Sequence, residues 1–153
     1  MTKQPNVVMI ITDQQRADTM ACYGNTVIKT PNLNKLADES FVFENAYVSQ
    51  PICTPSRSTI LTGIYPHATG CGINNFPLSP DIPTLAEMAP ADYLTAYYGK
   101  WHLGDDLQPQ HGFTEWISTE DAHDGNQPTW VDPAHKDRKS DYFDYLVAQG
   151  HEP

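Results

Sequence analysis

The sequence predicts an α/β fold with a mostly parallel sheet flanked by helices. Short apolar or aromatic segments alternate along the chain with segments that carry helix-start signals, which is the pattern of a parallel sheet with crossover helices. Residues 7–12, VVMIIT, form a continuous apolar run, which is typical of a strand buried on both faces. With 153 residues, 39% of them hydrophobic, the chain is long enough to bury a core.

The first half of the chain contains two further expected elements after that strand. Thr30 and Pro31 are suited to the N-cap and first position of a helix that continues through NLNKLADES. FVFENAYV, residues 41–48, is expected to form a second strand.

The middle of the chain contains helix-start and helix-stop signals. A helix is expected from about Ser56 to Thr62, and Gly63 should end it. Thr84 and Glu87 have the spacing of a capping box, although Pro90 should end that helix early.

The last third of the chain is predicted to hold one strand and one helix. YLTAYYG, residues 93–99, should form a strand that leads into Lys100-Trp101-His102-Leu103-Gly104. The chain is then expected to be loop-rich as far as Lys139. Ser140 should cap a last helix, DYFDYLVAQ, which ends at Gly150.

The composition excludes several classes of partner and site. The formal net charge is −10 and no basic stripe is present, so nucleic acid and anionic membranes are not expected partners. The three cysteines show neither a disulfide framework nor a CxxC zinc pattern. No run is long enough to span a membrane, and VVMII is too short for a signal peptide. A cytoplasmic location is therefore expected, or a periplasmic one if a leader is missing.

Polar residues follow the ends of the expected strands. Asp13 follows the first strand, Cys53 lies in the loop after the second, and Lys100 and His102 follow the third. In parallel sheets, binding sites collect at the carboxyl ends of the strands. These residues are therefore candidates for one shared site.

Cys53 has a setting suited to an anion or to a nucleophile. Pro55 fits the first turn of a helix, so Cys53 would lie beside free N–H groups and the positive end of the helix dipole. Arg57 adds a guanidinium whose geometry suits an oxyanion. Considered alone, this stretch is equally compatible with a cysteine that only packs.

Two ordered motifs resemble those of the type I sulfatases. CTPSR followed by STILTG is similar to their C-x-P-S-R signature with its L-T-G ending, and GKWHLG, residues 99–104, is similar to their second signature. The opening NVVMIITDQQRADTMACYGN and TPNLNKLADESFVFENAYV also resemble this family, so the likeness covers about residues 6–116. It implies an alkaline-phosphatase/sulfatase-like fold and sulfate ester hydrolysis.

The resemblance also implies a covalent modification of Cys53. In the family this cysteine is oxidised to formylglycine by machinery that reads the proline and arginine of the motif, here Pro55 and Arg57. The aldehyde hydrates, and one hydroxyl attacks sulfur and expels the alcohol. The second hydroxyl then loses its proton, so that sulfate leaves and the aldehyde returns.

A divalent metal is the implied cofactor. Asp13 and Gln14 correspond to two of its ligands, and the modified Cys53 is another. Many family members have a second aspartate where Gln14 stands, but an amide oxygen can also coordinate a metal. Oxygen ligands favour Ca²⁺, with Mg²⁺ or Mn²⁺ as alternatives.

The remaining implied roles belong to cationic side chains. Arg57 would hold the hydrated aldehyde and support the metal site. Lys100 and His102 would contact the sulfate group, and His102 could exchange protons. Both are expected to face one side of an extended segment, with Trp101 and Leu103 packed inward.

Other histidines and cysteines have weaker interpretations. His67 is expected in a loop or behind the site, and His111 to be structural or near the substrate. His123, Asp124 and His135 are more easily explained as solvated loop residues than as a second metal site. Packing roles are expected for Cys22 and Cys71.

Part of the family pattern has no counterpart in the sequence. The Asp-Asn or Asp-His pair that completes the family's metal site is not found before Pro153. We therefore expect residues 1–153 to be the N-terminal part of a single sulfatase catalytic domain, apparently truncated. The alternatives are a phosphonate or phosphate ester hydrolase of the same superfamily and a catalytically incompetent fragment. The expected substrate is a small-molecule or sugar sulfate ester, and the oligomeric state is left open.

Overall fold

The structure, a computed structural model, describes residues 4–119, 132–135 and 137–152. The chain folds as two compact units, Met1–Tyr47 and Val48–Pro153. In the described part of the chain, no helix has the length and apolar character that a membrane span requires.

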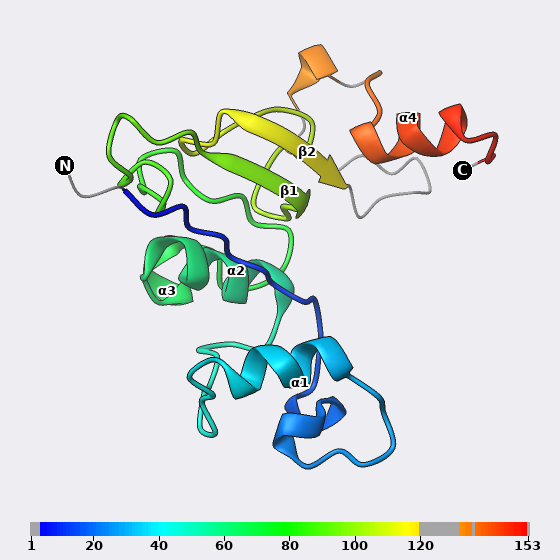
Figure 1. Cartoon of the computed structure of the whole chain (residues 1–153). Helices are drawn as coiled ribbons and strands as arrows, with labels where there is room; N and C mark the ends of the chain where they lie inside the picture. The colour runs from blue at the N-terminus through cyan, green and yellow to red at the C-terminus, as the bar shows by residue number, and fades with distance from the viewer. Residues whose placement is uncertain (1–3, 120–131, 136, 153) are drawn as a thin grey trace. The chain divides into compact units, whose positions relative to one another are not determined.

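The first unit is built around one α-helix. Two short 3-10 helices, η1 (Ala17–Thr19) and η2 (Ala21–Tyr23), precede α1 (Pro31–Asp38), as Figure 1 shows. Pro31 is at the start of α1, as expected, and Thr30 is the N-cap residue. The Thr30 hydroxyl does not cap the helix; it donates to Asn34 Oδ1 at 2.9 Å and accepts from the Ala21 N–H at 3.3 Å. Thr30 therefore ties α1 to η2.

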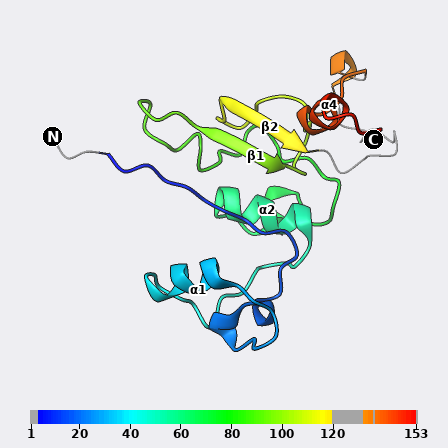
Figure 2. The same cartoon turned by 45° about the vertical axis from the view of Figure 1, so that its right-hand side comes forward.

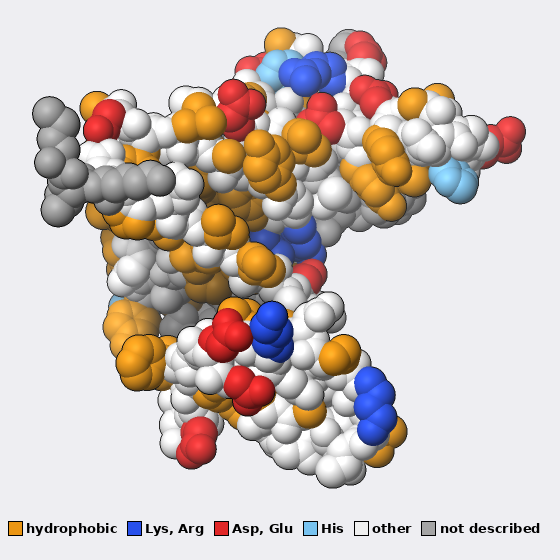
Figure 3. All heavy atoms as spheres, viewed as in Figure 1, with side chains coloured by type: hydrophobic (Ala, Val, Ile, Leu, Met, Phe, Trp, Pro, Cys, Tyr) orange, Lys and Arg blue, Asp and Glu red, His pale blue; other side chains and the backbone are white. Residues whose placement is uncertain are grey.

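Two strands expected in this unit are not formed. Neither residues 7–12 nor residues 41–48 pair with a neighbour, and the prediction of strands there was wrong for this structure. A strand requires a hydrogen-bonded partner, and no described segment provides one. Their side chains are largely exposed, for example Val7 (80%) and Phe41 (95%). Figure 3 shows hydrophobic side chains at the surface.

The second unit begins with two helices, α2 (Cys53–Thr62) and α3 (Pro66–Thr69). Helix α2 begins at Cys53 rather than at Ser56, with Ile52 as its N-cap residue and a bond of 2.9 Å from Ser56 N to Ile52 O. It ends as expected at Gly63, whose φ of 71° is left-handed and whose N–H donates to Thr59 O. The short helix α3 was not expected.

The sheet consists of two parallel strands, β1 (Ala96–Lys100) and β2 (Glu115–Thr119). Tyr97 is paired with Trp116 and Lys100 with Thr119, and the strands run side by side in both views (Figures 1 and 2). The expected parallel sheet is therefore confirmed. Strand β1 overlaps the expected range 93–99 and extends one residue beyond it, to Lys100. Strand β2 lies in a stretch that was expected to be loop.

The capping-box segment forms only a single helical turn. Thr84 N–H donates to Glu87 Oε2 at 2.8 Å, and Met88 N–H donates to Thr84 O at 3.1 Å. The turn goes no further, and Pro90 follows it, as expected from its lack of an N–H.

The C-terminal elements are η3 (Pro133–His135) and α4 (Asp141–Ala148). Ser140 caps α4 as expected, because its side chain accepts from Phe143 N–H at 3.2 Å. Helix α4 contacts β2.

The core of the second unit joins α2 to the sheet. Leu61 of α2 belongs to the same buried cluster as Trp101 and Leu103, and Tyr97 and Trp116 pack against it. The Tyr97 ring lies 5.0 Å from that of Trp101 and 5.2 Å from that of Trp116, which are favourable spacings for aromatic pairs. The full cluster comprises Leu61, Cys71, Leu78, Ala86, Trp101, Leu103 and Phe113.

Gly112 should be the glycine most sensitive to substitution. Its φ is 78°, and a Cβ there would lie 2.7 Å from the backbone nitrogen of Glu87. Gly112→Ala is therefore expected to lower the free energy of unfolding by about 2–3 kcal/mol, measured by urea titration. Gly70→Ala is the control, because Gly70 has φ of 80° but open space around it, so it should cost about 1 kcal/mol. Equal losses would show that the close contact contributes nothing.

Candidate active site

Cys53 is the first residue of α2, and a lysine lies beside it. The side chain is half-buried, and Lys100 Nζ is 3.7 Å from its Sγ. Lys100 is the last residue of β1, so the end of this strand places its ammonium group beside the start of α2. A cation at this distance, together with the helix dipole, attracts negative charge that forms at residue 53.

Arg57 lies one turn further along α2 and binds to the end of β1. It is only 7% exposed. Its Nη1 donates to the carbonyl oxygen of Lys100 at 2.5 Å and to the Tyr97 hydroxyl at 3.2 Å, and that hydroxyl donates to the same carbonyl. Burial raises the pKa of Tyr97, an effect that Arg57 opposes. The three residues therefore fix α2 against β1.

His102 has a backbone conformation that the sequence did not indicate. Its φ is 58°, so the segment is not extended there, and the expectation of simple alternation was wrong. Its N–H donates to Asp106 Oδ1 at 3.1 Å, and its carbonyl accepts from Thr54 Oγ1 at 2.9 Å. Its ring Nε2 lies 3.0 Å from Asn75 Oδ1. Trp101 and Leu103 are fully buried, as expected.

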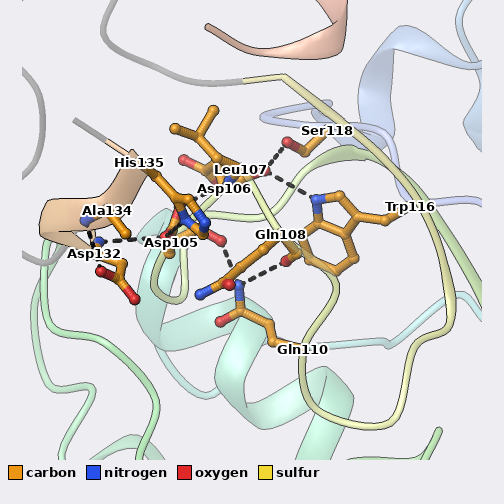
Figure 4. A network of polar contacts seen from close by, with 10 residues as sticks. All are labelled: Asp105, Asp106, Leu107, Gln108, Gln110, Trp116, Ser118, Asp132, Ala134 and His135. Carbon is orange, nitrogen blue, oxygen red and sulfur yellow. Dashed lines mark hydrogen bonds and ion pairs between the residues drawn. The ribbon is translucent and has the colours of Figure 1, made fainter. Parts of the chain in front are cut away.

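Asp106 links His102 to the second strand. Its carbonyl accepts from Trp116 Nε1 at 2.9 Å and from the Ser118 hydroxyl, while its carboxylate accepts from His102. Figure 4 shows Trp116 and Ser118 converging on this residue. The turn after the GKWHLG motif is therefore held by β2.

The neighbouring Asp105 binds a different segment. Its Oδ2 is 3.0 Å from His135 Nδ1 and accepts from Asp132 N–H at 3.3 Å (Figure 4). His135 is thus partly buried in an ion-pair geometry rather than fully solvated. His123 and Asp124 lie outside the described residues.

Asp13 and Gln14 belong to the first unit. Gln14 has φ of 43°, a left-handed conformation in which side chains other than glycine are uncommon. Their carboxylate and amide oxygens are the hard donors that calcium and magnesium prefer, so the donor chemistry fits such an ion. Among the described residues, no three His, Cys, Asp or Glu side chains are grouped closely enough for a metal ion. A metal site shared with Cys53 stays a prediction.

The other singled-out residues lie away from this network. His67 is in α3, and its ring stacks on Tyr65 at 5.9 Å. His111 has its ring 5.7 Å from that of Trp101, which is consistent with a structural role. Cys71 is buried in the core, and burial raises its pKa, whereas Cys22 is exposed, so its expected packing role was wrong.

The chain matches a known family over almost its whole length. The Sulfatase family model covers residues 5–150. The chain belongs to the sulfatase family.

The curated relatives of this chain include proteins named as sulfatases. An ulvan-active sulfatase from Formosa agariphila is 39% identical over 137 residues, which cover 84% of this chain and 27% of that protein. An N-acetylglucosamine-6-O-sulfatase from Bacteroides thetaiotaomicron is 36% identical over 133 residues, covering 86% of this chain and 23% of that protein. The chain therefore spans about a quarter of the length of these curated relatives.

A solved structure supports the predicted sulfatase-like fold. The crystal structure of yidJ from Bacteroides fragilis, a proposed sulfatase, matches with a TM-score of 0.67 and 32% identity. The match covers 80% of this chain and 34% of that chain.

Three residues that contact the expected site residues were not singled out in the sequence analysis. Tyr97 binds Arg57, Asn75 binds the His102 ring, and Asp106 binds the His102 backbone. Tyr97 could have been noticed because the hydroxyl of a tyrosine that packs against a core needs a hydrogen-bond partner. The contacts of Asn75 and Asp106 depend on the left-handed turn at His102, which no local pattern in the sequence indicates.

The hydroxyl of Tyr97 should make the stability of the chain depend on alkaline pH. Burial raises its folded-state pKa, whereas an unfolded tyrosine titrates near about pH 10. The stabilising contribution is therefore complete below about pH 10 and is lost as pH rises through the folded-state pKa. The free energy of unfolding of Tyr97→Phe, measured by urea titration at a series of pH values, should decline less steeply above this pH than that of the wild type.

Tyr98→Phe is the matched control, because Tyr98 is the next residue of β1 and is exposed. It should change the free energy of unfolding at neutral pH by less than about 0.5 kcal/mol. Tyr97→Phe should cost about 1 kcal/mol at neutral pH because two hydrogen bonds of the hydroxyl are lost. If Tyr97→Phe keeps the wild-type alkaline decline, the hydroxyl is not its source.

Proposed function

We propose that this chain carries the nucleophile-bearing part of a sulfate ester hydrolase, with Cys53 converted to formylglycine. The proposal is carried by one contact, the 3.7 Å approach of Lys100 Nζ to Cys53 Sγ at the start of α2. Arg57 and His102 support it, because Arg57 Nη1 donates to the carbonyl of Lys100 and the hydroxyl of Thr54, the residue after Cys53, donates to the carbonyl of His102. Membership of the sulfatase family agrees with this chemistry.

Each candidate residue of the second unit would have a different role in the reaction. A hydrated aldehyde at position 53 would supply a nucleophilic oxygen and a second hydroxyl whose deprotonation releases sulfate. Lys100, already beside position 53, would stabilise negative charge on the sulfonyl oxygens in the transition state. His102 would exchange a proton with the departing group or with the hydrate. Arg57 holds β1 in place and adds positive charge behind the nucleophile.

A divalent cation would be held by oxygen ligands of the first unit. Asp13 would supply a carboxylate and Gln14 an amide oxygen, and the oxygen of modified Cys53 would complete this part of the ligand set. The ion would act as a Lewis acid toward the hydrate. Calcium suits these ligands best, with magnesium or manganese as alternatives.

A sugar sulfate is the proposed substrate class. The relatives named above act, by their names, on ulvan or on N-acetylglucosamine 6-sulfate groups, and a further one from Bacteroides thetaiotaomicron is an N-acetylgalactosamine-6-O-sulfatase.

Oxidation of Cys53 can be measured directly by mass spectrometry. In protein isolated from its native host, the tryptic peptide of residues 36–57 should be lighter by about 18 Da than its thiol form. The peptides that carry Cys22 and Cys71 are internal controls and should keep their thiol mass. An unmodified Cys53 in protein that hydrolyses sulfate esters would contradict the proposed nucleophile.

The activity of the same preparation should depend on the residues around Cys53. Cys53→Ala should abolish hydrolysis of para-nitrophenyl sulfate, and Lys100→Met should lower kcat/KM by about 10²–10³-fold. Para-nitrophenyl phosphonate is the comparison substrate. Faster turnover of the phosphonate would favour a phosphonate ester hydrolase over the proposed activity, and full activity of Lys100→Met would overturn the proposed role of Lys100.

The metal should stabilise the protein through Asp13. Because an ion that binds only the folded state raises its stability, adding calcium after chelation should raise the thermal midpoint. Asp13→Ala should remove this increase, whereas Asp38→Ala, a change at the end of α1, should keep it. An equal calcium response in both variants would exclude Asp13 as a ligand.

A further inference from the structure

The turn formed by residues 72–75 is anchored next to the start of α2. Gln50 Nε2 donates to the Gly72 carbonyl at 2.7 Å, and Asn74 Oδ1 accepts from the backbone N–H of Thr54 at 3.0 Å. The residue before the turn, Cys71, is fully buried in the core. The position of this turn is therefore fixed relative to the residue that follows Cys53.

Asn75, the last residue of the turn, directs its side chain to His102. Its φ of 68° is left-handed, a conformation that asparagine tolerates better than most residues. Its Oδ1 is 3.0 Å from His102 Nε2, which is a normal hydrogen-bond distance. An amide oxygen at this position accepts a hydrogen bond from the ring only when Nε2 carries the proton.

The backbone of His102 is already fixed by other residues. Asp106 accepts from its N–H, and Thr54 donates to its carbonyl. Asp106 is only 7% exposed and is bonded to β2, so this support is rigid. The contact with Asn75 is made by the ring itself, so it bears on the side-chain torsions and on the tautomer of His102.

We propose that Asn75 is a positioning residue, which orients the His102 ring and holds its neutral form in the Nε2–H tautomer. This inference rests on the proposed function, in which His102 exchanges a proton near position 53. In that setting a defined tautomer places the basic nitrogen, Nδ1, and the proton-bearing nitrogen, Nε2, at fixed points. A ring free to rotate or to change tautomer would spend less time in the reactive arrangement.

The substitution Asn75→Gly tests the contact with little risk to the fold. Asn75 is exposed, so removing its amide leaves no buried cavity. Its positive φ suits glycine, so the turn should not be strained. Asn75→Asp keeps an oxygen acceptor at the same place and also tolerates this φ. Asn45→Gly, the same change at an exposed turn residue of the first unit, is the matched control.

Two measurements are required. In the enzyme from its native host, Asn75→Gly should lower kcat for para-nitrophenyl sulfate by about 10–100-fold with little change in KM, as do comparable losses of an orienting partner. Asn75→Asp should retain most of the activity, and Asn45→Gly all of it. With histidine-selective ¹⁵N labelling at about pH 9, where imidazole is neutral, His102 should be the Nε2–H tautomer in wild type and a mixture in Asn75→Gly.

The results separate this inference from the proposed function. Wild-type protein with formylglycine at position 53 but without sulfate ester turnover would refute the proposed function, and the NMR spectra alone would then decide the role of Asn75. An unchanged tautomer in Asn75→Gly overturns the inference in either case. Unchanged kcat in an active enzyme, or equal loss in Asn75→Gly and Asn75→Asp, also overturns it.

Discussion

The carbonyl oxygen of Lys100 is the point on which the candidate site depends. It accepts hydrogen bonds from Arg57 and from Tyr97, and these bonds join α2 to the end of β1. Cys53 begins that helix, and Lys100 carries the ammonium group beside it. The two signature motifs are far apart in sequence, so a contact between them is needed to hold Lys100 beside Cys53. The bond from the buried Arg57 side chain to the Lys100 backbone is such a contact. A guanidinium suits this task, since one nitrogen can serve two acceptors.

The sequence was informative where a local signal determines the structure. Pro31, Gly63 and Ser140 correctly marked ends of three helices, because caps and stop residues act within one turn. The parallel pairing of β1 was also anticipated, but its partner β2 was not. Residues 7–12 and 41–48 have strand-like composition without a ladder, since pairing depends on a distant neighbour that composition does not specify.

The same distinction applies to the site. The motifs identified Cys53, Arg57, Lys100 and His102, and the structure brings parts of all four into one connected region of the second unit. The turn at His102 could not be anticipated, because its φ of 58° is unusual for histidine and is imposed by bonds to residues elsewhere in the unit. Asn75 and Asp106 acquire their roles only through that turn. Their identities alone were compatible with ordinary loop positions.

The burial of the first turn of α2 has a consequence for how the protein is made. Thr54 and Pro55 are enclosed by the core, and Arg57 is held by β1. Under the proposed function, an oxidising enzyme must recognise Pro55 and Arg57 in order to act on Cys53. In the finished fold these side chains are inaccessible to a second protein. If Cys53 is converted as proposed, the conversion would therefore have to precede the folding of this stretch, while Pro55 and Arg57 are still accessible.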